Sequence, residues 1–308
     1  MENRAVIGIP RGMLYYRYET LWQVFFREIG VDFIISEPTR QDTAERGSAL
    51  AVDEACLSLK LFLGHVDALV GKCEYILIPR INSYGRNQEL CPRFSALYDI
   101  AINTFRDKGQ KFLPFSIDSH KNETEQDAFL CLGQALGVLP RKAKKAYETA
   151  RKEDQRLWKS KIQAQNALCS TDGLKILIAA HSYVIEDAYI GTPILEFLQR
   201  NHAAAIRADI VDRENACKHS PELSPTCKWE LSREILGGVL QRKDKVDGII
   251  LLSTFPCGPD AMVNDILLRK LHDKPVLNLV LDGQSGTAGL ETRLESFLDI
   301  IRFKKGLL

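Results

Sequence analysis

The sequence predicts an α/β fold with two doubly wound, Rossmann-like lobes that contain parallel sheets and are joined by a long charged helix. Short apolar runs alternate with amphipathic helical patterns along most of the 308 residues, which is the element order of parallel α/β folds. The strongest strand signal is 246–253 (VDGIILLS), a continuous apolar run typical of a strand buried on both faces. After a charged segment that begins at Pro140 the alternation starts again, which predicts a second lobe.

The N-terminal lobe is expected over residues 1–139. Its first helix, 18–29, places Leu21, Trp22 and Phe25 on one stripe, as a helix that covers a sheet does. Pro92 at a first helical position predicts another helix start. The expected strands are 5–10, 31–36, 75–81 and 111–117, and the expected helices are 18–29, 53–70, 91–105 and 123–136, with a long loop over 37–52.

The segment 140–171 is predicted to be the connecting helix, and the second lobe is expected over 172–308. Basic residues at the start of the helix are followed by Glu148, Glu153 and Asp154, which favours a solvated face over a nucleic-acid arm. In the second lobe the expected strands are 174–180, 204–211, 246–253 and 275–281, and the expected helices are 192–200, 229–241, 259–271 and 290–302, with a polar loop over 212–228.

Composition excludes several classes of function. The 41 basic and 40 acidic residues leave a net charge of +1, so no global field attracts nucleic acid or a membrane surface. No apolar run approaches the roughly 20 residues of a membrane span, and the first residues have no signal-peptide pattern. We therefore expect a cytoplasmic protein, in which the eight cysteines serve metal ligation or core packing rather than disulfides.

Three of the eight cysteines stand where a ligand site of such a fold is expected. In open parallel sheets, ligands bind outside the carboxyl ends of the strands. Cys257 follows the strand 246–253, Cys91 follows the strand 75–81, and Cys56 lies in a first helical turn. Helix starts carry a partial positive charge that stabilises thiolates and anionic clusters. The three thiols therefore predict one metallocluster site assembled from distant segments.

The other five cysteines fail this criterion. Cys73 precedes its strand, Cys131 lies inside an amphipathic helix and is expected in the core, and Cys169 ends the connecting helix. Cys217 and Cys227 stand in a polar loop without a histidine at zinc-finger spacing. The spacing of Cys56, Cys91 and Cys257 also matches no CxxC-type zinc or ferredoxin run, so three small buried side chains at helix starts are the alternative interpretation.

Several segments around these thiols resemble one known family. They are 7–12 (IGIPRG), 22–26 (WQVFF), 53–66 (DEACLSLKLFLGHV), 255–264 (FPCGPDAMVN), 281–289 (LDGQSGTAG) and 292–297 (TRLESF). Together they resemble the activase-associated, DUF2229-like proteins of the 2-hydroxyacyl-CoA dehydratase superfamily, from near residue 6 to near residue 302. The sequence departs from the family's closing pattern at Gly283, Gln284, Ser285 and Thr287, where acidic residues and histidine are common.

The resemblance implies an iron–sulfur protein. In the dehydratases, three cysteines hold a [4Fe–4S] cluster whose remaining iron is open to a small ligand or the substrate acyl thioester. An ATP-dependent activator protein supplies a low-potential electron. Carried over, the ligands here would be Cys56, Cys91 and Cys257. A double-cubane cluster, known in relatives, would need more well-placed thiols.

Candidate residues beyond the thiols are weaker. His181 and Tyr183 follow the strand 174–180 at its carboxyl end, where a substrate contact or a helix-capping role would suit them. Lys60 lies one turn after Cys56 and would face the cluster or solvate its helix, while His65 is expected to be structural.

Three functional hypotheses follow. The first is an enzyme of low-potential reduction or dehydration chemistry, either a 2-hydroxyacyl-CoA dehydratase-like lyase or a component of an ATP-dependent reductase, in a homodimer or hetero-oligomer. The second is an electron carrier or accessory cluster protein without its own substrate. The third is a cluster-free scaffold. No GxGxxG or P-loop pattern supports nucleotide binding by this chain.

Overall fold

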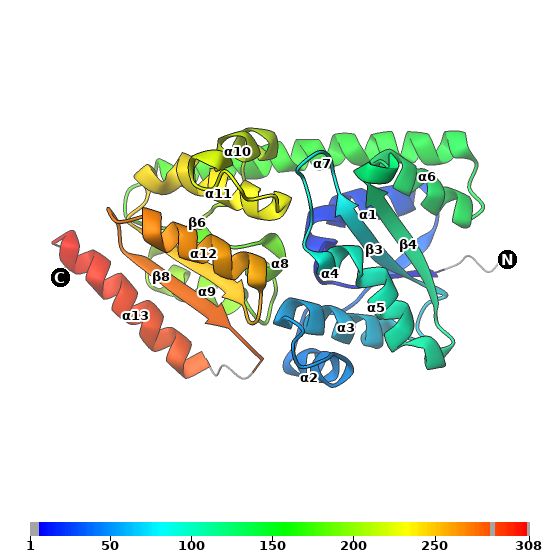
Figure 1. Cartoon of the computed structure of the whole chain (residues 1–308), viewed down its shortest axis with the longest axis horizontal. Coiled ribbons are helices and arrows are strands. Elements are labelled where there is room, and N and C mark those ends of the chain that lie inside the picture. Colours follow the sequence, from blue (N-terminus) through cyan, green and yellow to red (C-terminus); the bar gives the residue numbers. More distant parts are fainter. Residues whose placement is uncertain (1–5, 284–286, 307–308) are drawn as a thin grey trace. The chain divides into compact units, whose positions relative to one another are not determined.

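The computed structural model describes residues 6–283 and 287–306 and confirms the predicted fold class (Figure 1). Two four-stranded sheets are present, and every strand pair within them is parallel. The chain divides into two compact units, Met1–Lys159 and Ser160–Leu308. The lobes 1–139 and 172–308 with a connecting segment 140–171 stay a prediction about domain organisation.

The first unit contains a sheet of order β2-β1-β3-β4. Because β2 and β3 lie on opposite sides of β1, the order of the strands reverses between β1 and β3. Ligands of doubly wound sheets bind at the carboxyl ends of strands at such a point. The elements are β1 (Val6–Ile9), α1 (Tyr15–Ile29), β2 (Asp32–Ile35), α2 (Gln41–Leu50), α3 (Leu57–Leu69), β3 (Tyr75–Ser83), α4 (Pro92–Ser95), α5 (Leu97–Thr104), β4 (Lys111–Asp118) and α6 (Glu125–Ala135).

An aromatic cluster holds this unit together. The predicted stripe of α1 is buried, and Trp22 contacts Phe115 of β4 at a ring-centroid distance of 5.6 Å. Phe115 in turn lies 5.0 Å from Phe129 of α6, and Phe25 lies 4.8 Å from the same ring. These edge and tilted contacts pack α1 and α6 against the same strand.

The second unit repeats the strand order as β6-β5-β7-β8, with the reversal between β5 and β7. Helices α11 and α12 pack on one face of the sheet through Leu236 and Leu267, and α12 lies across β7 in Figure 1. Phe297 and Ile301 of α13 lie against Gly248 of β7. The elements are β5 (Leu174–Ala179), α8 (Ser182–Ile185), α9 (Thr192–Arg200), β6 (Ala203–Arg207), α10 (Arg213–His219), α11 (Glu230–Arg242), β7 (Gly248–Thr254), α12 (Gly258–Lys270), β8 (Val276–Leu281) and α13 (Thr287–Lys304).

Helix α7 (Pro140–Cys169) is the long charged helix, and only alanines of its first half are buried: Ala143, Ala146 and Ala150. Tyr147 Oη donates to Glu125 of α6 at 3.0 Å, while Gln165 accepts a hydrogen bond from the Arg207 amide at 2.8 Å. Its two halves therefore bond to different units. None of the helices in the described ranges has the length and hydropathy that crossing a membrane requires.

The structure corrects several expectations. The expected loop 37–52 contains α2, a polar helix that buries only Thr43, Ala44 and Gly47, because close backbone packing on α3 replaces an apolar stripe. Helix 91–105 is broken at Ala96 into α4 and α5. The polar loop 212–228 contains α10, which buries Cys217.

Cys131 is exposed rather than in the core. The buried face of α6 consists of Ala128, Phe129, Leu132 and Gly133. Cys131 does not lie on this face. Gln284 and Ser285, two of the positions at which the sequence departs from the family's closing pattern, lie outside the described residues.

Candidate functional site

The three cysteines selected from the sequence are all N-cap residues. Cys56 caps α3, Cys91 caps α4 and Cys257 caps α12. Each is half-buried, and no cap side chain bonds to its own helix at these three described positions. The first backbone N–H groups of a helix lack intrahelical acceptors. The Cys56 and Cys257 thiols therefore stand beside donors that favour a negative charge, whereas α4 after Cys91 has only four residues and begins with Pro92, which has no N–H.

Cys91 and Cys257 hold equivalent places in the two sheets. Cys91 follows β3 and Cys257 follows β7, in each case the strand beside the reversal of strand order. Cys56 comes from a different connection, because it ends the loop between α2 and α3. Cys56 and Cys91 belong to the first unit and Cys257 to the second. That these thiols share one cluster stays a prediction.

Close packing of α2 on α3 positions Cys56. A Cβ atom at Gly47 would lie 1.8 Å from the Lys60 carbonyl oxygen, and one at Gly64 would lie 2.1 Å from the Thr43 carbonyl oxygen. Only glycine permits this backbone approach at both crossing points. Lys60 Nζ donates to the Asp53 carbonyl at 3.1 Å and so ties α3 to the loop that ends at Cys56. This contact favours a structural role for Lys60.

His65 of α3 is a buried support of the same unit. Ser36 Oγ lies 3.0 Å from its Nδ1 and Thr39 Oγ1 lies 2.9 Å from its Nε2. Burial, with smaller effects from Arg11 and Arg46, lowers the pKa of His65 to about 3. The imidazole is therefore neutral at physiological pH and acts as a bridge between the residues after β2 and α3.

We expect His65 to make the protein less stable in mild acid. Its folded pKa of about 3 lies below the ordinary 6.5, so between these pH values only the unfolded state binds the proton. The free energy of unfolding should therefore fall as pH decreases, by about 2 kcal/mol from pH 7 to pH 5 for this group. Urea unfolding of the wild-type protein and of His65→Gln should be measured at both pH values. The variant lacks the histidine, so its free energy of unfolding should fall by about 2 kcal/mol less than that of the wild type. The exposed His219 provides the control, and an unchanged pH dependence in His65→Gln would contradict the assignment.

A cavity of about 580 Å³ is lined by residues after β2, by the start of α2 and by the end of α3. Among its charged residues, Arg46 is paired with Asp42 at 3.2 Å. The cavity is lined by Leu69, the last residue of α3, and by Lys72, which follows this helix. Cys56 caps the opposite end of the 13-residue helix. Since a helix rises 1.5 Å per residue, the two ends lie about 20 Å apart. The cavity is therefore not part of the cysteine site.

In the second unit, His181 and Asp260 form a buried pair. His181 is the N-cap of α8 after β5, and its Nε2 lies 2.7 Å from Asp260 Oδ1 in the first turn of α12. Burial lowers the pKa of His181, but Asp260 raises it through charge and hydrogen bonding, and more distant Asp209 and Glu234 add to this, so the net shift is upward. The ring of Tyr183 stacks on His181 at 5.0 Å. The sequence pointed to His181 and Tyr183, whereas the partner Asp260 was missed.

Asp187, close to these residues in the sequence, has a local structural role. Its Oδ1 accepts hydrogen bonds from the amides of Tyr189 at 2.8 Å and Ile190 at 3.1 Å. The carboxylate therefore closes the turn before α9.

The structure also groups three potential metal ligands that the sequence did not bring together. Sγ of Cys217 and one carboxylate oxygen each of Glu230 and Glu234 lie within 4.8 Å of one another, and all three residues are buried. The glutamates are one turn apart on α11, while Cys217 comes from α10. Their spacing on α11 was the only sequence signal.

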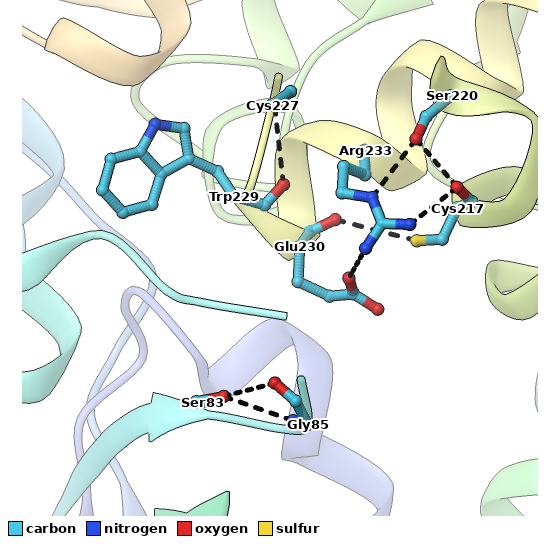
Figure 2. Close-up of polar contacts among 8 residues, drawn as sticks. All are labelled: Ser83, Gly85, Cys217, Ser220, Cys227, Trp229, Glu230 and Arg233. Atoms are coloured by element: carbon cyan, nitrogen blue, oxygen red, sulfur yellow. Dashed lines mark hydrogen bonds and ion pairs between the residues drawn. The ribbon is translucent and has the colours of Figure 1, made fainter. Parts of the chain in front are cut away.

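Arginines already compensate this acidic group. Figure 2 shows Arg233 bonded to the Glu230 carboxylate at 3.2 Å, the Cys217 carbonyl at 2.9 Å and Ser220 Oγ at 3.3 Å. Arg213 lies 4.0 Å from Glu234. Burial, followed by the charges of Glu230 and Glu234, raises the pKa of the Cys217 thiol. A protonated thiol is a poor metal ligand, so the contacts favour a buried ion-pair network that joins α10 to α11.

Comparisons with known proteins identify one family. The family model described as CoA enzyme activase uncharacterised domain (DUF2229) matches residues 6–211. The match includes Cys56 and Cys91, whereas Cys257 lies beyond its end. No curated protein matches the chain.

Solved structures show only remote similarity. The manganese complex of the SBP FpvC from Pseudomonas aeruginosa is 12% identical over 97% of this chain and 98% of that chain, with a TM-score of 0.29. Its nickel complex is 14% identical over 97% and 96%, with a TM-score of 0.29. ZnuA is 12% identical over 97% and 99%, with a TM-score of 0.27.

Proposed function

The chain belongs to the DUF2229 family of CoA enzyme activase domains, and we propose that it is an iron–sulfur protein that holds one [4Fe–4S] cluster through Cys56, Cys91 and Cys257. The observation that carries the proposal is that all three thiols are half-buried N-cap residues. The resemblance selects the same three cysteines. Two of them lie within the residues that the family model matches.

The donor set suits such a group. Thiolates are the usual ligands of iron–sulfur clusters, and three cysteines would leave one iron position for another ligand. The helix starts after Cys56 and Cys257 begin helices of 13 residues each, whose dipoles offset negative charge at their N-termini. When bound, the cluster would supply low-potential electron transfer and an open coordination position.

We place this chemistry in an enzyme related to the 2-hydroxyacyl-CoA dehydratases, with an acyl thioester as substrate and an ATP-dependent activator as electron donor. The observation that favours an enzyme is the buried His181–Asp260 pair, because Asp260 lies on the first turn of the helix that Cys257 caps. Buried ionisable pairs of this kind cluster at catalytic sites. An electron carrier or accessory cluster protein without its own substrate is the second candidate.

The test is anaerobic reconstitution of the full chain with iron and sulfide. We expect equal amounts of the two to remain bound after desalting, and an EPR signal of a reduced [4Fe–4S] cluster. A change of that signal on addition of an acyl-CoA would support the enzyme, whereas an unchanged signal would support the carrier. Iron lost completely on desalting would contradict both.

A further inference from the structure

The His181–Asp260 pair lies at the reversal of strand order in the second sheet. His181 follows β5 and Asp260 follows β7, the two adjacent strands at that point. The side chains are only 7% and 8% exposed, and their closest atoms are 2.7 Å apart. The carboxyl ends of these strands are where ligands of doubly wound sheets bind.

Asp260 and Cys257 are neighbours on their helix. Cys257 is the N-cap of α12 and Asp260 the third helical residue, the two positions whose side chains bond to each other's backbone N–H groups in a capping box. Here the Cys257 side chain makes no cap hydrogen bond, and Asp260 points its Oδ1 at His181 instead. The contact with His181, which follows β5, thus fixes the Asp260 carboxylate in the first turn of the helix that Cys257 caps.

The second oxygen of the Asp260 carboxylate is not used in the contact with His181. Oδ2 of Asp260 is buried and has no hydrogen-bond partner among the described residues. A buried acceptor without a partner has lost its hydrogen bonds to water and gained none in return, which is most unfavourable when the group is charged. A pair that served packing alone would gain from satisfying this oxygen, so the unpartnered Oδ2 in the first turn of α12 indicates a partner that binds at this helix start.

The surrounding charges favour a charged pair. Asp209 and Glu234 add to Asp260 in stabilising the protonated form of His181. Asp209 is itself paired with Arg207 at 2.5 Å, and Glu234 lies 4.0 Å from Arg213. Asp209 and Glu234 are therefore compensated by arginines, while Asp260 and His181 compensate each other.

We propose that the His181–Asp260 pair sets the electrostatic potential at Cys257, with Asp260 acting directly on the group bound there and His181 as its positioning residue. The inference rests on the proposed cluster. A negative charge near an iron–sulfur cluster lowers its reduction potential, and a positive charge raises it. Removal of each partner should therefore shift the potential in opposite directions.

The experiment measures the midpoint potential of the reconstituted full-length protein by EPR-monitored dithionite titration. Asp260→Asn keeps the shape of the carboxylate and removes its charge, so we expect a higher potential. His181→Gln places an amide near the position of ring Nε2 and leaves the Asp260 anion uncompensated, so we expect a lower potential. The double variant restores a neutral pair and should return toward the wild-type value.

Matched controls make the same substitutions away from the site. Asp247→Asn removes a carboxylate that Lys305 contacts at 2.6 Å at the amino end of β7, and His219→Gln removes an exposed histidine paired with Glu222 at 2.9 Å. Both should leave the potential unchanged.

Each outcome separates the inference from the proposed function. Opposite shifts with unchanged iron content support the inference. Shifts in the same direction, no shift, or iron loss confined to the pair variants overturn it and assign the pair a structural role. Absence of iron from the wild-type protein overturns the proposed function first, and the inference with it.

Discussion

Serine in place of Cys257 is expected to abolish stable cluster binding. The Cys257 thiol is held at the N-cap of α12, and serine at this position would have to ligate iron as an alkoxide, which is far less accessible at neutral pH than a thiolate. Even substitutions of residues behind the ligands typically reduce metal affinity 10–100-fold. We therefore expect retained iron to fall at least about tenfold, measured by iron counting after anaerobic reconstitution and desalting.

Cys56→Ser and Cys91→Ser should show the same loss, because the proposal gives the three thiols equal roles. Cys131→Ser is the matched control, since Cys131 is an exposed residue of α6, and it should bind iron as the wild-type protein does. Iron retained by Cys257→Ser at the wild-type level would remove Cys257 from the ligand set. Circular dichroism of each variant establishes that the fold is intact.

Alanine at Gly47 is expected to cause the largest loss of stability from a single methyl group in this unit. The added Cβ would lie 1.8 Å from the carbonyl oxygen of Lys60 and 2.6 Å from its carbonyl carbon. Both are backbone atoms, so α2 and α3 must separate rather than repack a side chain. Overpacking of this kind costs about 1–3 kcal/mol, and we expect a value of about 3 kcal/mol in urea unfolding.

Gly289→Ala is the control for Gly47→Ala. Gly289 lies within α13, and a Cβ atom there meets no atom within 4 Å among the described residues. Alanine should therefore stabilise the helix by about 0.5–1 kcal/mol. Because the α2–α3 packing positions Cys56, Gly47→Ala should also reduce retained iron, whereas Gly289→Ala should not. Equal unfolding free energies of the two variants would contradict the close packing of α2 on α3.

Much of the fold follows from local patterns. The apolar run 246–253 corresponds to β7, which is buried at every position. A short, continuous apolar run is typical of a central parallel strand, because both faces of such a strand are covered. Pro92 marked the start of α4, and Cys91 and Cys257 were correctly placed at helix starts after strands. Cys56 was placed in the first turn and proved to be the N-cap itself.

Other features depend on contacts between segments that are distant in the sequence. Helix α2 has too few apolar residues to be recognised, and its fit depends on the approach of Gly47 to Lys60. The pairing of Asp260 with His181 could not be predicted from local sequence, because the two residues are 79 positions apart. Cys217 was assigned to a polar loop, yet α10 and α11 bury it against Glu230 and Glu234.

Composition, periodicity and helix-start residues were thus sufficient to predict a parallel α/β chain with thiols at three helix starts, because these properties are encoded within a few turns of the backbone. The pairing of His181 with Asp260 and the close crossing of α2 and α3 required the folded chain. Hydrogen bonds and close backbone contacts form only when two groups lie within a few ångströms of each other. Residues that are far apart in the sequence reach such distances only when the folded chain packs their segments together.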